Sequence, residues 1–375
     1  MVLLLELARG LAALWVFLFH VKGVFELALP GIYQLSAYGS LGVPMFFVIS
    51  GYVIACSAES CLERNKPPLA FLKARALRIY PTFWASVAIV LLTPYLVELI
   101  SSFKSGVYVS PENIAAKLDL AEWTAFLSLS KVFWATTNDL QAEFSTINSV
   151  YWTLAIEFQF YIVVFLALNF RQYYRHVIAA VSVVALLLMV FPVQMNHGLF
   201  IHYWPSFSVG LGLAYLHRGG FWAERLCKGG AMQLAVVLLV SGLLIASVAM
   251  SGGGHLAFAL CFGAFLWAIS GLERFLGQIK KGGNRFYFWL LEPWLMLGAM
   301  SYSVYLLHGK INPLPHMFVR QLVGPGSVWY GLLIIIGTLL LCYPFYLLVE
   351  RRFLSKRYKQ IHQAVLTGAS GAVQG

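Results

Sequence analysis

A cation and an imidazole share one face of the first apolar segment, LELARGLAALWVFLFH. Arg9 and His20 are eleven positions apart, and eleven steps of about 100° return to nearly the same helix face, about 16 Å further along the axis. Imidazole is the side chain best matched to proton transfer near neutral pH. A structural alternative has Arg9 reaching the polar surface and His20 bonding another helix. The spacing therefore marks the pair as a candidate acid–base site.

A basic cluster follows the second apolar segment. The run FLKARALRIYPTFW carries Lys73, and then Arg75 and Arg78 at a spacing of three, which places both arginines on one side of a helix. Paired guanidiniums suit phosphate groups because each can donate two parallel hydrogen bonds. A charge signal that orients a membrane helix would explain the basic residues, but not the aromatic Tyr80 and Trp84 that follow. Both interpretations stay open.

A carboxylate lies inside the apolar segment VYWTLAIEFQFY. Glu157 is about ten residues, or ~15 Å, from the outer end of the predicted span Ile147–Phe170. A buried carboxylate needs a partner, and a histidine or arginine from another helix is expected. His20 is predicted at a comparable level of its own helix. A structural salt bridge is the alternative interpretation.

Two further segments carry weaker candidates. Ser50 lies in VPMFFVISGYVIA beside Gly51, where close helix packing is the favoured interpretation, and no Ser–His–Asp triad is predicted. Ser303 and His308 lie in SYSVYLLH. The tyrosines of this segment are typical of an aromatic belt at a membrane surface. That interpretation explains His308 less well.

The composition around these groups suits a membrane protein. Of 375 residues, 60% are hydrophobic and 11% are charged, with a net charge of +11, whereas typical soluble domains are about 25% charged. These values disfavour a soluble enzyme, a nucleic-acid binder and a disordered scaffold. A charge within a span costs at least ~2.5–3.5 kcal/mol, so Arg9, His20 and Glu157 each require a partner or a purpose.

Ten segments come close to the length of about 20 apolar residues that crosses a bilayer. They are Ala8–Glu26, Gly39–Cys56, Ile79–Ile100, Ile147–Phe170, Val177–Val193, Leu199–Leu216, Ala231–Met250, His255–Leu272, Glu292–Lys310 and Val328–Val349. With the N-terminus inside, 20 of the 26 Lys and Arg residues fall on the inner side, as the positive-inside rule requires. The prediction is an all-α polytopic protein of about ten transmembrane helices, N-in and C-in. Insertion then explains the positive charge without a nucleic-acid partner.

Taken in order, these segments resemble the acyltransferase 3 family of integral membrane acyltransferases. The resemblance runs from about Leu3 to Phe353 and includes LELARGLAALWVFLFH, GVPMFFVISGYVI, FLKARALRIYPTFW, SVYWTLAIEFQFY, SYSVYLLH and VERRF. It implies a ten-helix unit that moves an acyl group, usually acetyl, from cytoplasmic acyl-CoA to a hydroxyl, typically on a surface polysaccharide or lipopolysaccharide. The Arg-x10-His motif of the family falls on Arg9 and His20, and its Arg-x-x-Arg motif on Arg75 and Arg78.

This resemblance assigns an expected role to each candidate. Arg75 and Arg78, helped by Lys73, would hold the CoA phosphates, with Arg9 along the path of the pantetheine arm. His20 would be the general base, and Glu157 would orient its imidazole. The acceptor side would be lined by Ser50, Tyr151, Trp152, Ser303 and His308.

The remaining expectations concern organisation and partners. Residues 1–353 would form the transmembrane domain and 354–375 a cytoplasmic tail, disordered at its end, with no extracytoplasmic hydrolase-like domain. Acetyl-CoA would be the co-substrate, a glycan or lipid-linked sugar the acceptor, and the bacterial inner membrane the location. No metal is expected. Two alternatives stay open: a transporter or flippase for a polar or lipid-linked sugar with a His/Glu proton relay, and a non-catalytic membrane scaffold.

Overall fold

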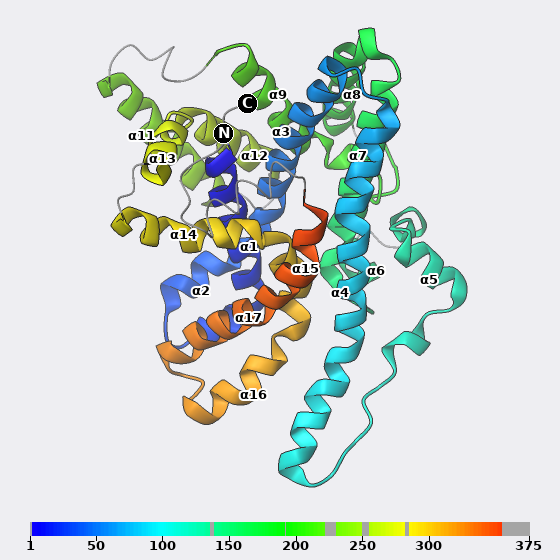
Figure 1. The fold of residues 1–375 in the computed structure, drawn as a ribbon, viewed down its shortest axis with the longest axis vertical. Coiled ribbons are helices and arrows are strands. Elements are labelled where there is room, and N and C mark those ends of the chain that lie inside the picture. Colours follow the sequence, from blue (N-terminus) through cyan, green and yellow to red (C-terminus); the bar gives the residue numbers. More distant parts are fainter. Residues whose placement is uncertain are drawn as a thin grey trace.

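The computed structural model describes residues 2–135, 139–191, 193–221, 230–249, 255–281 and 285–354. Across these ranges the chain is helical and contains no β-strand, so the all-α prediction is confirmed for them (Figure 1). The predicted tail from residue 355 onwards lies outside the described residues. The α-helices are α1 Val2–Val21, α2 Pro30–Ala37, α3 Gly42–Glu63, α4 Pro68–Ser105, α5 Leu120–Leu127, α6 Leu140–Phe144, α7 Trp152–Leu168, α8 Tyr174–Val190, α9 Trp204–Arg218, α11 Gly230–Ala249, α12 His255–Ala268, α13 Leu272–Lys281, α14 Arg285–Ala299, α15 Ser301–Ile311, α16 Pro313–Leu322 and α17 Val328–Leu348.

Fewer helices than predicted are long and apolar enough to cross a bilayer. Within the described ranges there are seven, or up to nine if each of two bent helix pairs is one span. The predicted span Leu199–Leu216 corresponds to α9, which has only 15 residues and carries a proline in its first turn. Proline suits a helix start and not a helix interior because it has no N–H. The count of ten is therefore not reached here, and the N-in/C-in orientation stays a prediction.

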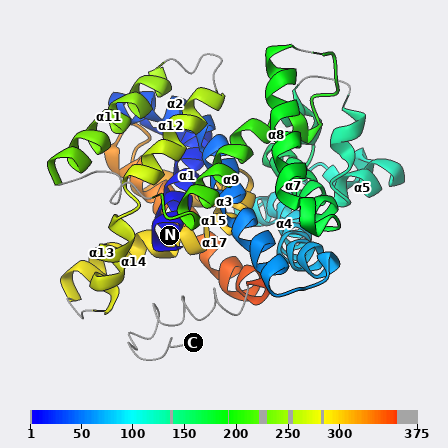
Figure 2. The same ribbon diagram turned by 90° about the horizontal axis from the view of Figure 1, so that it is seen from above.

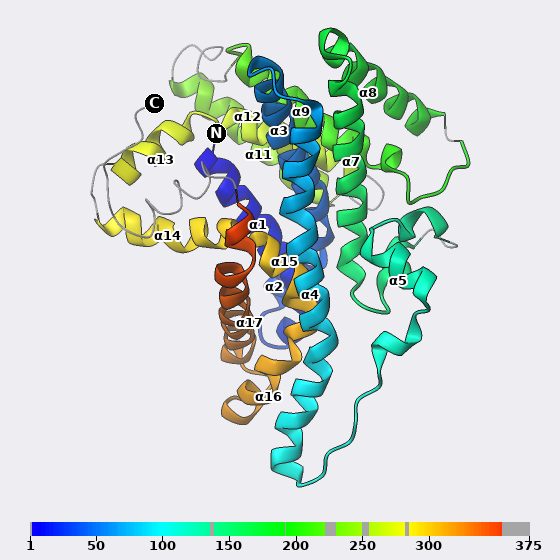
Figure 3. The ribbon, with the colours of Figure 1, turned by 45° about the vertical axis from the view of Figure 1, so that its right-hand side comes forward.

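Helix α4 carries the arginine pair and is much longer than the span predicted at Ile79–Ile100. It has 38 residues, about 57 Å at 1.5 Å per residue, against a hydrocarbon core of ~30 Å. Its C-terminal end projects beyond the helices around it (Figure 3). Because the helix already begins at Pro68, Arg75 and Arg78 lie on a continuous helix rather than in a loop.

Glycines set the distance between the central helices. A methyl group added at Gly210 of α9 would lie 1.9 Å from the carbonyl oxygen of Val48, and one added at Gly51 of α3 would lie 2.1 Å from that of Phe207. The backbones of α3 and α9 are therefore in direct contact, as small residues permit between membrane helices. This contact fixes the part of α3 that carries Ser50.

A sharp break between α14 and α15 brings a helix start into the interior. The two helices meet at an angle of 76°, and α15 begins at Ser301. Seen from above, α1, α3 and α15 lie at the centre, with α7 and α8 on one side and α11 to α14 on the other (Figure 2). Every candidate residue except Tyr151, which lies in the 3-10 turn before α7, therefore comes from these central helices or from their neighbours α4 and α7.

Candidate active site

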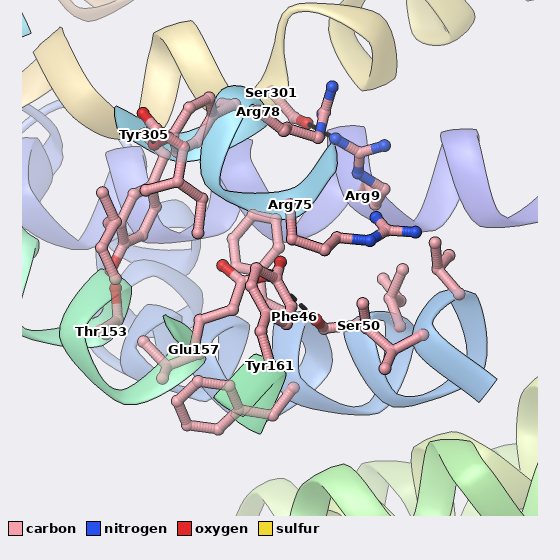
Figure 4. Close-up of a pocket in the computed structure, with 18 residues that line it drawn as sticks. Arg9, Phe46, Ser50, Arg75, Arg78, Thr153, Glu157, Tyr161, Ser301 and Tyr305 are labelled. Carbon is pink, nitrogen blue, oxygen red and sulfur yellow. Dashed lines mark hydrogen bonds between the residues drawn. The ribbon is translucent and has the colours of Figure 1, made fainter. Parts of the chain in front are cut away.

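A cavity of about 120 Å³, which several charged side chains line, lies where α1, α3, α4, α7 and α15 meet (Figure 4). We call it the arginine cavity, because its lining includes Arg9, Arg75 and Arg78. Ser50 and Glu157 line it as well. Five of the predicted site residues, which come from four different helices, are thus brought together.

Two of the three arginines are held by neighbouring groups. Arg9 donates to Ser301 Oγ at 3.2 Å and lies 3.6 Å from the Glu6 carboxylate, one turn earlier on α1. Arg78 lies 3.7 Å from Glu350, which is 1% exposed. These contacts fix the two guanidiniums at the edge of the cavity before any ligand binds.

Arg75 has a different environment. Its guanidinium carbon lies 5.9 Å from the ring centre of Tyr161 and 5.8 Å from that of Phe71. No ion pair to Arg75 is present among the described residues. A guanidinium held on aromatic faces keeps its N–H donors available, so Arg75 is the best placed of the three to bind an incoming anion.

Glu157 is held by two hydroxyl groups. Ser50 Oγ donates to Oε1 of Glu157 at 2.9 Å, and Tyr161 OH donates to the same oxygen at 2.5 Å. Tyr161 lies one turn further along α7. The carboxylate is therefore part of the arginine cavity, where it offsets one of three positive charges.

A second cavity, of about 340 Å³, contains the candidate base. We call it the histidine cavity, because His20, His202 and His255 line it. Trp152 also lines it, with its ring 5.3 Å from that of Tyr203. His20 is in the last turn of α1, at the opposite end of that helix from Arg9.

The two cavities lie back to back. Val43, Phe47 and Tyr305 line both of them, and we call these three side chains the dividing wall. The Tyr305 hydroxyl is 2.7 Å from Thr153 Oγ1, and the Phe46 ring packs against its ring at 5.5 Å. These shared side chains thus separate the two cavities.

Several predicted positions need correction. Glu157 was expected to orient the His20 imidazole, but its hydrogen bonds go to Ser50 and Tyr161, and the ring nearest to His20 is that of His308. Lys73 is exposed and lies outside the lining of the arginine cavity. A position on one helix does not determine which residue of another helix it will face, and this is why the Glu157–His20 pairing failed.

Of the expected acceptor-side residues, only Trp152 lines the histidine cavity, whereas Ser50 lines the arginine cavity and His308 lines neither cavity. The other two, Tyr151 and Ser303, are also elsewhere. Tyr151 is fully buried, 2.9 Å from Ser86 Oγ and packed on Phe83. Ser303 donates to Glu350 from both its backbone N–H and its hydroxyl. Neither residue lines the arginine cavity or the histidine cavity, so both support the structure around the site.

Sequence reasoning missed residues whose spacing could have revealed them. Thr153, Glu157 and Tyr161 recur every four residues along α7, so they form one polar stripe on an apolar helix. Glu350, in the segment VERRF, was not predicted as a site residue, yet it is buried against Arg78. A buried acid beside a basic run has no signature at sequence level that distinguishes it from an exposed one.

The fold and the site together define a class of protein. The described helices are those of an integral membrane protein, and its interior holds a cationic cavity beside one that contains an imidazole. No group of three or more His, Cys, Asp or Glu able to hold a metal is present in the described part of the chain. The arrangement suits transfer of a group from an anionic donor to a neutral acceptor.

The chain belongs to the acyltransferase 3 family. The sequence model of that family, described as "Acyltransferase domain", matches residues 3–347. An O-acetyl transferase of Shigella phage Sf6 is 30% identical over 158 residues, which are 42% of this chain and 43% of the phage protein. The match therefore spans less than half the length of that relative. No solved structure matches the chain.

Proposed function

We propose that the protein is an O-acyltransferase that moves an acyl group, acetyl in the first instance, from acyl-CoA to a hydroxyl of a sugar or glycan. The observation that carries the proposal is the pair of cavities on either side of the dividing wall. Three guanidiniums line the first cavity and suit the phosphates of CoA. The imidazole of His20 lines the second and suits a hydroxyl acceptor.

The chemistry follows from this arrangement. Arg75, with Arg9 and Arg78, binds the phosphates, and the thioester reaches towards His20 past the dividing wall. The imidazole nitrogen of His20 takes the proton of the acceptor hydroxyl as its oxygen bonds to the thioester carbonyl carbon. The carbon–sulfur bond then breaks, and the CoA thiolate takes the proton back from the imidazolium. Glu157 contributes by ordering the arginine cavity rather than by touching His20.

Location and direction form part of the same proposal. We place the chain in the bacterial cytoplasmic membrane with both termini inside, since the basic residues collect on that side. Arg9 is near the start of α1 and His20 is in its last turn, so the donor enters from the cytoplasm. The acceptor, a surface polysaccharide, lipopolysaccharide or glycolipid, approaches from the other side.

Two measurements test this function. Cells with and without the gene are compared by mass spectrometry of their surface glycans, and an acyl-sized mass increase is expected only with it. Purified protein in nanodiscs is supplied with acetyl-CoA and those glycans, and free CoA thiol is measured. Accumulation of a sugar substrate in vesicles without CoA release would instead identify the transporter alternative.

A further inference from the structure

The His20 ring contacts a second, fully buried histidine. His308 of α15 is 0% exposed, and its Nε2 lies 3.2 Å from His20 Nδ1. The Nδ1 of each ring also lies 2.9 Å from a carbonyl oxygen one turn earlier on its own helix, Val16 for His20 and Val304 for His308. Because a carbonyl oxygen can only accept, both Nδ1 atoms must carry a hydrogen.

This requirement fixes the direction of the hydrogen bond between the rings. A neutral imidazole with hydrogen on Nδ1 has an unprotonated Nε2, so His308 Nε2 accepts from His20 Nδ1–H. The single Nδ1 hydrogen of His20 is then shared between the Val16 carbonyl oxygen at 2.9 Å and His308 Nε2 at 3.2 Å. If His308 also carried a hydrogen on Nε2, that N–H would point at the Nδ1–H of His20, and the two rings could not form a hydrogen bond. The bond leaves Nε2 of His20 without a hydrogen, and no residue in the described ranges hydrogen-bonds to that atom. His20 lines the histidine cavity, whereas His308 lines neither cavity.

The His308 ring itself is held in place. The Phe17 ring packs against it at 5.6 Å and the Tyr305 ring at 6.3 Å. Tyr305 is anchored in turn through its hydroxyl to Thr153. A ring fixed by packing and by its own helix carbonyl presents its lone pair in one direction, towards His20.

We propose that His308 is a positioning residue, which together with the Val16 carbonyl holds His20 in the tautomer whose Nε2 can accept a proton, and which stabilises the imidazolium that forms. When Nε2 of His20 takes the proton of the acceptor hydroxyl, positive charge spreads to Nδ1–H, and the lone pair of His308 faces that hydrogen. The position of His20 in the last turn of α1 adds the negative end of the helix dipole. This inference rests on the proposed function, in which His20 is the base.

Two amide substitutions of His308 distinguish a role in positioning His20 from a role in packing alone. In His308→Gln the side-chain oxygen can reach the place of Nε2 and accept from His20, whereas in His308→Asn it is one methylene group too short. We expect His308→Asn to lower kcat about 10- to 100-fold, a fraction of the contribution of a general base, with KM for acetyl-CoA unchanged. His308→Gln should stay within about threefold of the wild type. Equal kcat values in the two variants would overturn the proposal.

A spectroscopic measurement is independent of turnover. The ¹⁵N NMR spectrum of histidine-labelled protein in nanodiscs, assigned by difference with a His20→Gln variant, reports which nitrogen of His20 is protonated. We expect hydrogen on Nδ1 in the wild type, with that resonance shifted in His308→Asn and restored in His308→Gln. Hydrogen on Nε2 in the wild type would overturn the proposal even if His308→Asn does not fold. Absence of acyl transfer by the wild type, in contrast, would refute the proposed function and leave the tautomer assignment standing.

Discussion

The arginine cavity and the histidine cavity share a wall but differ in charge. The first is lined by three guanidiniums and one carboxylate, whereas no Asp, Glu, Lys or Arg is among the described residues that line the second. Their volumes also differ, at about 120 and 340 Å³. Charge is suited to an anionic donor, and a larger, neutral and partly aromatic cavity is suited to a sugar. In the proposed function, donor binding and proton transfer are therefore divided between the two cavities.

The largest expected effect comes from removing the imidazole. His20→Ala should lower kcat by about 10²- to 10⁴-fold, the usual contribution of a general base, and leave KM for acetyl-CoA within about twofold. CoA release and acceptor acylation by purified protein measure both constants. His176→Ala, at an exposed histidine of α8, is the matched control and should match the wild type. A raised KM with an unchanged kcat in His20→Ala would contradict the division of roles.

Removal of Arg75 should have the next largest effect, and it should change KM for acetyl-CoA rather than kcat. A hydrogen bond to a charged group contributes about 1.5–3 kcal/mol, so Arg75→Ala should raise KM for acetyl-CoA by about 10- to 100-fold with little change in kcat. Lys73→Ala, two residues earlier and exposed, is the control and should bind normally. Equal affinities for acetyl-CoA in the two variants, measured by calorimetry, would show that Arg75 is not the donor site.

The helices could be predicted from the sequence more reliably than their contacts. The apolar segments and the two arginine motifs were visible because hydrophobic runs and i, i+3 spacing are local properties. The partners of Glu157 and His20 on other helices were not, since Ser50 and His308 are distant from them in sequence. Ser50 hydrogen-bonds Glu157 across 107 positions, and His308 contacts His20 across 288.

The ends of the helices also could not be predicted from hydropathy, for a physical reason. Hydropathy placed the start of the third span at Ile79, but α4 begins at Pro68. Eleven residues that include three cations lower the average hydropathy without breaking the helix, since Lys and Arg are good helix formers. In α9 the opposite happened, because the helix begins at Trp204 rather than at Leu199, with a proline in its first turn that marks its start within an apolar run.

A smaller effect on the arginine side can show whether Glu157 acts there. Glu157→Gln keeps the shape of the side chain but removes its charge and weakens the hydrogen bonds from Ser50 and Tyr161. We expect KM for acetyl-CoA to change by about three- to tenfold, with kcat within about threefold. A loss of kcat as large as that of His20→Ala, with KM unchanged, would return Glu157 to the role of orienting the imidazole.

The last expected effect, similar in size, concerns the dividing wall and tests whether the acyl group passes it. Phe47 lines both cavities, and its ring packs on Phe160 at 5.4 Å. Phe207 packs on the same ring at 4.4 Å but lines neither cavity. Phe47→Leu and Phe207→Leu therefore remove similar aromatic packing, but only the first opens the wall.

One methylene group in an apolar passage contributes about 1–3 kcal/mol to the discrimination between acyl chains of different length. Because Leu is smaller than Phe, Phe47→Leu should lower part of this discrimination. The ratio of kcat/KM for butyryl-CoA to that for acetyl-CoA should therefore rise about three- to tenfold in Phe47→Leu and stay unchanged in Phe207→Leu. Comparing this ratio removes any shared loss of stability from the result. If both variants kept the wild-type ratio while remaining active, the acyl group would not cross at Phe47, and the two cavities would have to communicate by another route.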